Sequence, residues 1–148
     1  MKDLKAFQIL SDIAWDLTPV ANNVRMSSML VIKNEIISIG SATMKSHPYQ
    51  KRFGKTEQSI FLHAEINSIQ KALRRISVDD LSSSTLFICR VKMFSTQCYT
   101  NVKHYHHKKY PGYGLARPCS GCFRALVEFG IKRVVYTLDN ELLTWEEL

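Results

Sequence analysis

Apolar residues at helical spacing open the chain. They recur at intervals of three and four positions: Leu4, Phe7, Leu10, Ile13, Ala14 and Leu17. This spacing predicts an amphipathic helix over about residues 1–17, with one apolar face turned toward a core. Pro19 follows directly and marks the end of the helix.

Two short apolar and β-branched runs come next, at residues 28–33 and 36–39. Asn34 and Glu35 separate them, and a two-residue break of this kind is typical of a β-hairpin. We therefore expect two antiparallel strands joined by an Asn34-Glu35 turn. The polar stretch 43–59 that follows is expected to be a loop.

The second half of the chain alternates strand and helix patterns. The expected elements are a helix at 61–75, a strand at 85–91, a helix at 120–129 ended by Gly130, a strand at 133–137 and a short C-terminal helix. This order predicts an α/β fold, with helices packed on a mixed sheet and right-handed crossovers between parallel strands. Residues 92–117, here called the insertion, are longer than an ordinary connection and are expected to be functional or oligomer-forming.

Composition places the chain among soluble globular proteins. With 148 residues, 45% hydrophobic and 22% charged, a single domain over 1–148 is expected, and disordered, collagen-like and coiled-coil classes are excluded. The sequence shows neither an apolar run of the roughly 20 residues that a membrane span needs nor a secretory signal, so a cytoplasmic protein is expected. A net charge of +7 favours anionic partners such as phosphates or nucleic acid.

A pair of cysteines at a predicted helix start carries the candidate chemistry. Cys119 and Cys122 follow Pro118 and fall within one turn, so both thiols can bind the same ion. With His63 as third ligand, two thiolates and one imidazole leave the fourth position of a zinc ion open for water, which is typical of catalytic zinc. Glu65 stands two residues after His63, where it can move a proton without binding the metal.

Each of these residues also has a purely structural interpretation. Cys119 and Cys122 also suit a closed zinc knuckle or two buried thiols, and His63 with Glu65 suits polar groups at a helix N-terminus. Cys89, within the 85–91 strand, is expected to be a packed core thiol rather than a ligand. The four residues taken together favour the catalytic zinc site.

The motif His63-Ala64-Glu65, followed by Pro118-Cys119-Ser-Gly-Cys122, resembles the signature of the zinc-dependent cytidine deaminase superfamily. The resemblance extends to the strand at 85–88 and to the run from Gly130 to Tyr136, and is closest to the deoxycytidylate deaminase-like group. It implies a three-layer cytidine deaminase-like fold, in which a mixed sheet of the five-stranded type carries helices on both faces.

The resemblance also implies a reaction and a site. The reaction is hydrolytic deamination of a cytosine-type base in a free nucleotide or nucleoside, with dCMP to dUMP and ammonia as the favoured case. One catalytic Zn²⁺ is held by His63, Cys119 and Cys122, Glu65 is the proton shuttle, and the protein is a homo-oligomer. Further substrate contacts are expected from four residues: Ala64, Pro118, Arg117 and His47.

The insertion is rich in basic and aromatic residues and contains no acidic one. These residues include Lys92, Lys103, Lys108, Lys109 and Arg117, His104, His106 and His107, and Tyr99, Tyr105, Tyr110 and Tyr113. This composition suits a nucleic-acid strand, so the alternative function is a deaminase acting on cytosine or adenine within single-stranded DNA or RNA, including tRNA.

Other interpretations of the insertion stay open. It also suits a solvated loop or an oligomer contact, and Cys98 with the nearby histidines also suits a second, structural zinc site. A third function is a catalytically idle, zinc-stabilised nucleic-acid-binding protein.

Overall fold

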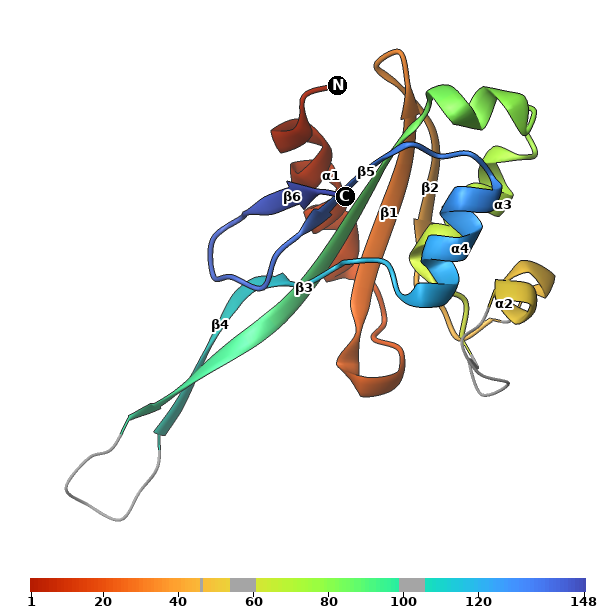
Figure 1. The fold of residues 1–148 in the computed structure, drawn as a ribbon. Helices are drawn as coiled ribbons and strands as arrows, with labels where there is room; N and C mark the ends of the chain where they lie inside the picture. Colours follow the sequence, from red (N-terminus) through yellow and green to blue (C-terminus); the bar gives the residue numbers. More distant parts are fainter. Residues whose placement is uncertain (46, 54–60, 99–105) are drawn as a thin grey trace.

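A six-stranded mixed sheet with helices on both faces forms the centre of the protein (Figure 1). The computed structural model describes residues 1–45, 47–53, 61–98 and 106–148, and of residues 22, 96–98 and 106–108 only the backbone. Within this part the strand order is β2-β1-β3-β5-β6, and β4 pairs with β3. The predicted three-layer α/β architecture is confirmed, with one strand more than the five expected.

The strands pair in both directions. β1 (Arg25–Ile32) is antiparallel to β2 (Glu35–Ser41) and to β3 (Thr85–Cys98), β5 (Arg133–Thr137) is parallel to β3, and β6 (Trp145–Glu147) is antiparallel to β5. The turn between β1 and β2 lies at Lys33 and Asn34, with φ of 46° and 66°. A tight hairpin turn requires positive φ at both central residues, so the turn predicted at Asn34-Glu35 was wrong by one residue.

The helices divide between the two faces of the sheet. α1 (Asp3–Asp16) covers one face, where Phe7 packs edge-on against Phe87 of β3. α3 (Ala64–Ala72) and α4 (Ser120–Glu128) cover the other face. The predictions for 1–17 and 120–129 are confirmed, and Gly130 has the positive φ (76°) of a helix-ending glycine. The predicted 61–75 helix is shorter because Leu62 pairs with Thr43 before the helix begins.

Two expectations for local structure were wrong. The predicted loop contains a short helix, α2 (Pro48–Phe53), whose Phe53 is buried against Phe129 at a ring distance of 5.9 Å. The predicted C-terminal helix is instead the strand β6, because the exposed edge of β5 offers backbone partners. Trp145 of β6 also packs against Phe7 at a ring distance of 5.3 Å.

The insertion continues the sheet as a hairpin. β3 runs on from the predicted strand to Cys98, and β4 (His106–Gly114) returns antiparallel beside it. The short 3-10 helices Ala21–Asn23 and Asp79–Ser83 complete the described elements. Among the described residues, no helix combines the length and apolar character needed to cross a membrane.

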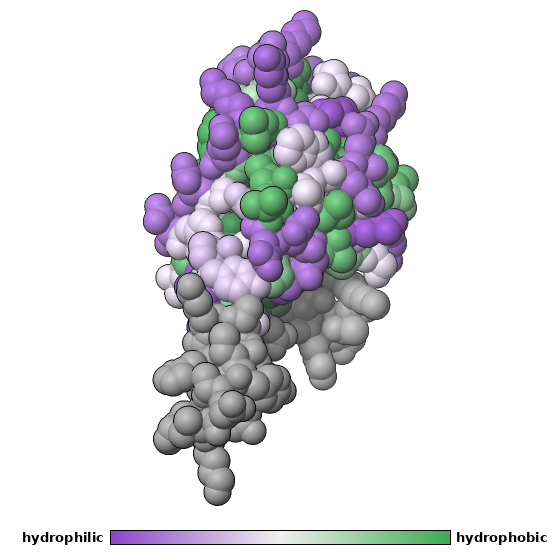
Figure 2. Space-filling model, turned by 90° about the vertical axis from the view of Figure 1, so that its left-hand side faces the viewer, coloured by the Kyte–Doolittle hydropathy of each residue, from purple (hydrophilic) through white to green (hydrophobic). Residues whose placement is uncertain are grey.

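The face on the left of Figure 1 is shown in Figure 2. There, hydrophilic residues surround smaller hydrophobic areas, as expected for a surface in contact with water. Beneath the surface, Cys89 is fully buried and desolvation raises the pKa of its thiol to about 12. The prediction that Cys89 is a core thiol is confirmed.

Gly40 allows α3 to lie directly on β2. A Cβ atom at this position would be 2.3 Å from the backbone nitrogen of Ser68 and 2.6 Å from the carbonyl oxygen of Ala64. Both atoms belong to the helix backbone, so neither can move without shifting the helix. Gly40 therefore sets the height of α3 above the sheet.

We expect Gly40→Ala to lower the free energy of unfolding by about 3 kcal/mol, because overpacking against backbone is poorly relieved. Gly130→Ala is the matched control: a Cβ there meets nothing within 4 Å, so only its positive φ (76°) adds a cost, of about 1–2 kcal/mol. Urea unfolding measures the free energy of unfolding of both variants and of the parent protein. Equal losses for the two variants would contradict the close contact at Gly40.

Candidate functional site

The three predicted ligand residues meet where α3 and α4 begin. The Nδ1 atom of His63 lies 3.3 Å from Sγ of Cys122 and 3.7 Å from Sγ of Cys119. All three ligand atoms lie within 4.8 Å of one another, and they form the one such His/Cys/Asp/Glu group in the described part of the chain. Residues 56 positions apart in sequence are thus brought together by the packing of two helices on one face of the sheet.

The N-terminus of α4 positions the two sulfur atoms. Cys119 is the N-cap residue, and its Sγ accepts a hydrogen bond from the backbone N–H of Cys122 at 3.4 Å. A hydrogen bond from the Cys122 thiol, with further help from His63, lowers the pKa of Cys119 to about 3. The same hydrogen bond, together with burial, raises the pKa of Cys122. The hydrogen bond to Cys119 likewise raises the pKa of His63. The site therefore holds a thiolate at neutral pH.

His63 is oriented by neighbours outside the predicted motif. Its backbone N–H donates to Oε1 of Gln50 at 2.9 Å, and Gln50 is only 3% exposed. Phe61 stacks on the imidazole ring at 4.9 Å between ring centres. On the helix side, the carbonyl of His63 accepts from the N–H of Asn67. These contacts fix the direction in which Nδ1 points.

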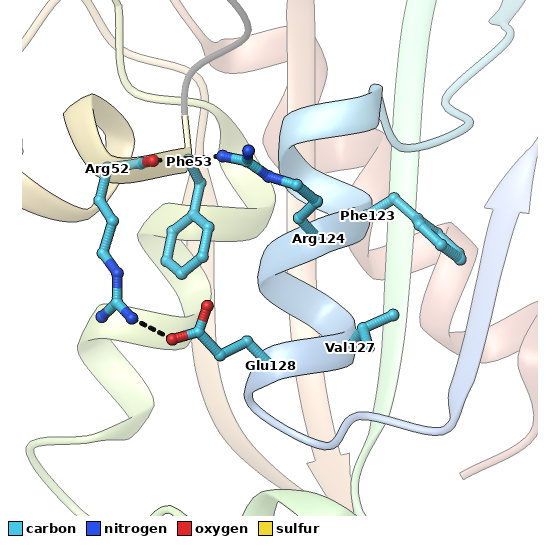
Figure 3. A pocket seen from close by; sticks show the side chains of 6 residues that line it. All are labelled: Arg52, Phe53, Phe123, Arg124, Val127 and Glu128. Carbon is cyan, nitrogen blue, oxygen red and sulfur yellow. Dashed lines mark hydrogen bonds and ion pairs between the residues drawn. The ribbon is translucent and has the colours of Figure 1, made fainter.

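Gln50 is held in place because α2 is attached to α4. Arg52 forms an ion pair with Glu128, and Nη2 of Arg124 donates to the carbonyl oxygen of Arg52 at 3.2 Å (Figure 3). These residues, with Phe53, Phe123 and Val127, line a pocket of about 590 Å³ between the two helices. Its lining includes none of the predicted site residues. We therefore assign these contacts to the support of α2.

Glu65 lies on the first turn of α3 and is 3% exposed. Its Oε2 atom is buried and has no hydrogen-bond partner, while desolvation raises the pKa of the carboxyl group. The helix backbone around it is fixed: Ser28 donates to the carbonyl of Ala64 at 2.7 Å, and Ser68 donates to that of Glu65 at 2.9 Å. A buried carboxylate oxygen without a partner is costly unless it serves a ligand.

The four further predicted substrate contacts lie in different surroundings. Ala64 is fully buried, and Pro118 is half-buried beside Cys119. Arg117 is exposed, and its charge opposes the rise in the pKa of Tyr136 that burial and a hydrogen bond to Glu146 cause. The Nδ1 atom of His47 accepts from the backbone N–H of Tyr49 at 3.1 Å, so its ring caps the start of α2. A substrate contact from these residues stays a prediction.

The sequence from residue 1 to 138 matches the family model described as the cytidine and deoxycytidylate deaminase zinc-binding region. The chain belongs to this deaminase family. The match covers both halves of the site, since the His63 motif and the cysteine pair fall inside it. The sequence has no significant match among curated proteins.

Solved structures of a dCMP deaminase from the cyanophage S-TIM5 share the fold. The apo form has a TM-score of 0.58 at 17% identity, covering 95% of this chain and 88% of that chain. The complex with dCMP and dUMP has a TM-score of 0.56 at 19% identity, covering 96% and 87%. At these identities the likeness establishes a shared fold.

The donor set of this deaminase-family site fits a zinc ion. In tetrahedral coordination, Zn–S and Zn–N bonds of ordinary length place sulfur and nitrogen donors roughly 3.6 Å apart. The two measured distances from His63 Nδ1, 3.3 and 3.7 Å, are close to this value. Two thiolates and one imidazole also match zinc in their chemistry. His63, Cys119 and Cys122 are therefore suited to hold the ion that the family name specifies.

Sequence reasoning missed the residues that support the candidate site. Gln50 and Phe61 contact His63, and Ser28 holds the carbonyl of Ala64 beside Glu65, yet none belongs to the motif. The only available signal was the closeness of Phe61 to His63 in sequence. The suggested second zinc site at Cys98 and the nearby histidines depends on side chains outside the described residues.

Proposed function

We propose that this protein deaminates a cytosine-type base in a free nucleotide by zinc-dependent hydrolysis, with dCMP to dUMP and ammonia as the reaction. The observation that carries the proposal is the His63, Cys119 and Cys122 group, with the buried carboxylate of Glu65 beside it. Membership of the deaminase family and the likeness to a dCMP deaminase crystallised with dCMP and dUMP support it.

His63, Cys119 and Cys122 would hold the metal. Three protein ligands leave one coordination position for a fourth group. When bound, zinc would polarise water and so supply a nucleophile near neutral pH. Hydrogen bonding at the start of α4 keeps Cys119 in the thiolate form that a metal ligand requires.

Glu65 would transfer protons in this reaction. Its unpartnered Oε2 takes a proton from the attacking water and delivers it to the ring nitrogen. Glu65 then takes the second proton from the hydroxyl group now on the ring carbon and delivers it to the departing amino group. A C–O bond forms and the C–N bond breaks, so that cytosine and water give uracil and ammonia. Burial helps because water outside the site cannot compete for the transferred proton.

The nucleotide would lie against the segment that leads into α4. We propose Ala64 and Pro118 as wall residues, and Arg117 as the contact for the phosphate because it is basic, exposed and two residues from Cys119. His47 would border the same opening. We also propose that residues 1–148 act as one deaminase domain in a cytoplasmic homo-oligomer.

We expect zinc-loaded protein to release ammonia from dCMP. The value of kcat/KM for dCMP should exceed that for deoxycytidine by about tenfold or more, since a charge-assisted phosphate contact contributes about 1.5–3 kcal/mol. The assay would compare cytosine and adenine nucleosides, their phosphates, and short single-stranded DNA and RNA.

Two results of this assay would overturn the proposal. One is turnover of oligonucleotides alone, which would make the protein a nucleic-acid deaminase. The other is a lack of turnover of every compound by protein whose zinc content is verified, which would favour a binding role without catalysis.

A further inference from the structure

The outer part of the β3–β4 hairpin leaves the body of the protein. It comprises residues 92–98 and 106–112, here called the arm, whose strands pair from Lys92 with Gly112 to Cys98 with His106. β1 reaches β3 only as far as Val91. Beyond that point the described arm strands pair only with each other, and Figure 1 shows them extending away from the helices. A two-stranded hairpin is marginally stable alone in water, so it benefits from a partner.

The arm concentrates positive charge. The sequence contains no acidic residue between Asp80 and Glu128, although it has 13 in all. Among the arm residues whose side chains are described, two are basic, Lys92 and Lys109, and none is acidic. A projecting element with one sign of charge attracts a partner of the opposite sign.

Aromatic rings lie beside these positive charges. Phe94 and Tyr110 stack across the arm with ring centres 5.8 Å apart and planes 11° apart, and both are half-buried. The amino group of Lys92 lies 4.7 Å from the centre of the Phe94 ring. Gly112 makes room for this arrangement, because a Cβ there would be 2.4 Å from that ring. Flat rings next to cations are suited to stacked bases and phosphates.

An acidic loop contacts the root of the arm. Asp139 forms an ion pair with Lys92, and Glu141 accepts a hydrogen bond from the Tyr110 hydroxyl at 2.8 Å. The backbones of Asn140 and Tyr113 also exchange two hydrogen bonds. Asp139 and Glu141 thus bind the Lys92 amino group and the Tyr110 hydroxyl, which are the groups that a phosphate would contact.

We propose that the arm binds single-stranded nucleic acid, with its lysines on the phosphates and its aromatic rings against the bases, and that Asp139 and Glu141 compete with this ligand. The surface is separate from the candidate deaminase site. Binding therefore does not depend on which compound the protein deaminates, or on whether it deaminates one.

The test is the binding of fluorescently labelled oligothymidylate and oligouridylate of about 16 nucleotides. Fluorescence anisotropy is measured with the Glu65→Gln protein, so that turnover plays no part. Affinity should fall steeply between about 50 and 200 mM salt. K92Q/K109Q should bind about ten- to thirtyfold more weakly at low salt, and should lower the slope of log K against log salt by about 1.4. D139N/E141Q should bind about three- to tenfold more tightly.

Charge-matched variants away from the arm separate its effect from that of net charge. K2Q/K5Q removes two exposed positive charges at the start of α1, and E35Q/D79N removes two exposed negative ones toward the end of β3 opposite the arm. Both should bind like the parent protein. The proposal is overturned by absence of binding at low salt, by equal effects of arm and control variants, or by binding of phosphatidylserine vesicles without binding of either oligonucleotide.

Discussion

Replacing Glu65 with Gln is expected to lower kcat for dCMP by about 10²–10⁴-fold, the usual contribution of a positioned proton-transfer group. The amide has nearly the same shape but cannot carry the proton. Since Glu65 is not among the three grouped ligand residues, zinc content should not change. Ammonia release at saturating dCMP measures kcat, metal analysis measures zinc content, and thermal unfolding shows whether the variant is folded.

Asp12→Asn is a matched control for this change, because it makes the same acid-to-amide replacement at an exposed site on α1. Its kcat should equal that of the parent protein. If Glu65→Gln kept more than a tenth of the parent kcat, Glu65 would not be the proton shuttle. If it lost zinc or unfolded, Glu65 would be a structural residue.

The candidate site could be predicted because its key residues lie within short motifs. Cys119 and Cys122 share one helical turn, and His63 is two residues from Glu65, so local spacing alone indicates the chemistry. The His63 motif and the cysteine pair come together if α3 and α4 lie on the same face of the sheet. An alternating order of strands and helices produces this arrangement in α/β folds.

The support for His63 could not be predicted in this way. Gln50 lies on a six-residue helix, too short to show a reliable apolar period. The helix forms because Phe53 packs against Phe129 and Arg52 pairs with Glu128, which are contacts with a distant part of the chain. The sequence around residues 48–53 does not by itself predict such long-range contacts.

The arm and β6 were missed for related reasons. The strand signal is an alternation of buried and exposed residues, and the outer arm strands carry no third strand among the described residues that would bury one side. β6 has only three residues, and it exists because β5 has a free edge and Trp145 packs on Phe7. A short C-terminal helix was therefore the wrong expectation for this segment.

Replacing Cys122 with Ser is expected to weaken zinc binding by more than about 100-fold, since loss of even an outer partner of a ligand costs 10–100-fold. The parent protein should bind about one zinc per chain through its single described ligand group. A ligand that binds only the folded state stabilises it, so the variant should also unfold at a lower temperature than the zinc-loaded parent. Metal analysis after dialysis and a zinc titration followed by thermal unfolding measure both effects.

Cys89→Ala is the control, because it removes a buried thiol from the opposite face of the sheet without touching the site. It should lose some stability through the small cavity but retain its zinc and its response to added metal. Cys98→Ser should likewise retain one zinc per chain. A parent protein with two zinc ions, one of them lost in Cys98→Ser, would establish the second site. Full zinc binding by Cys122→Ser would instead show that the His63, Cys119 and Cys122 group does not hold the metal, and the proposed deamination would fail with it.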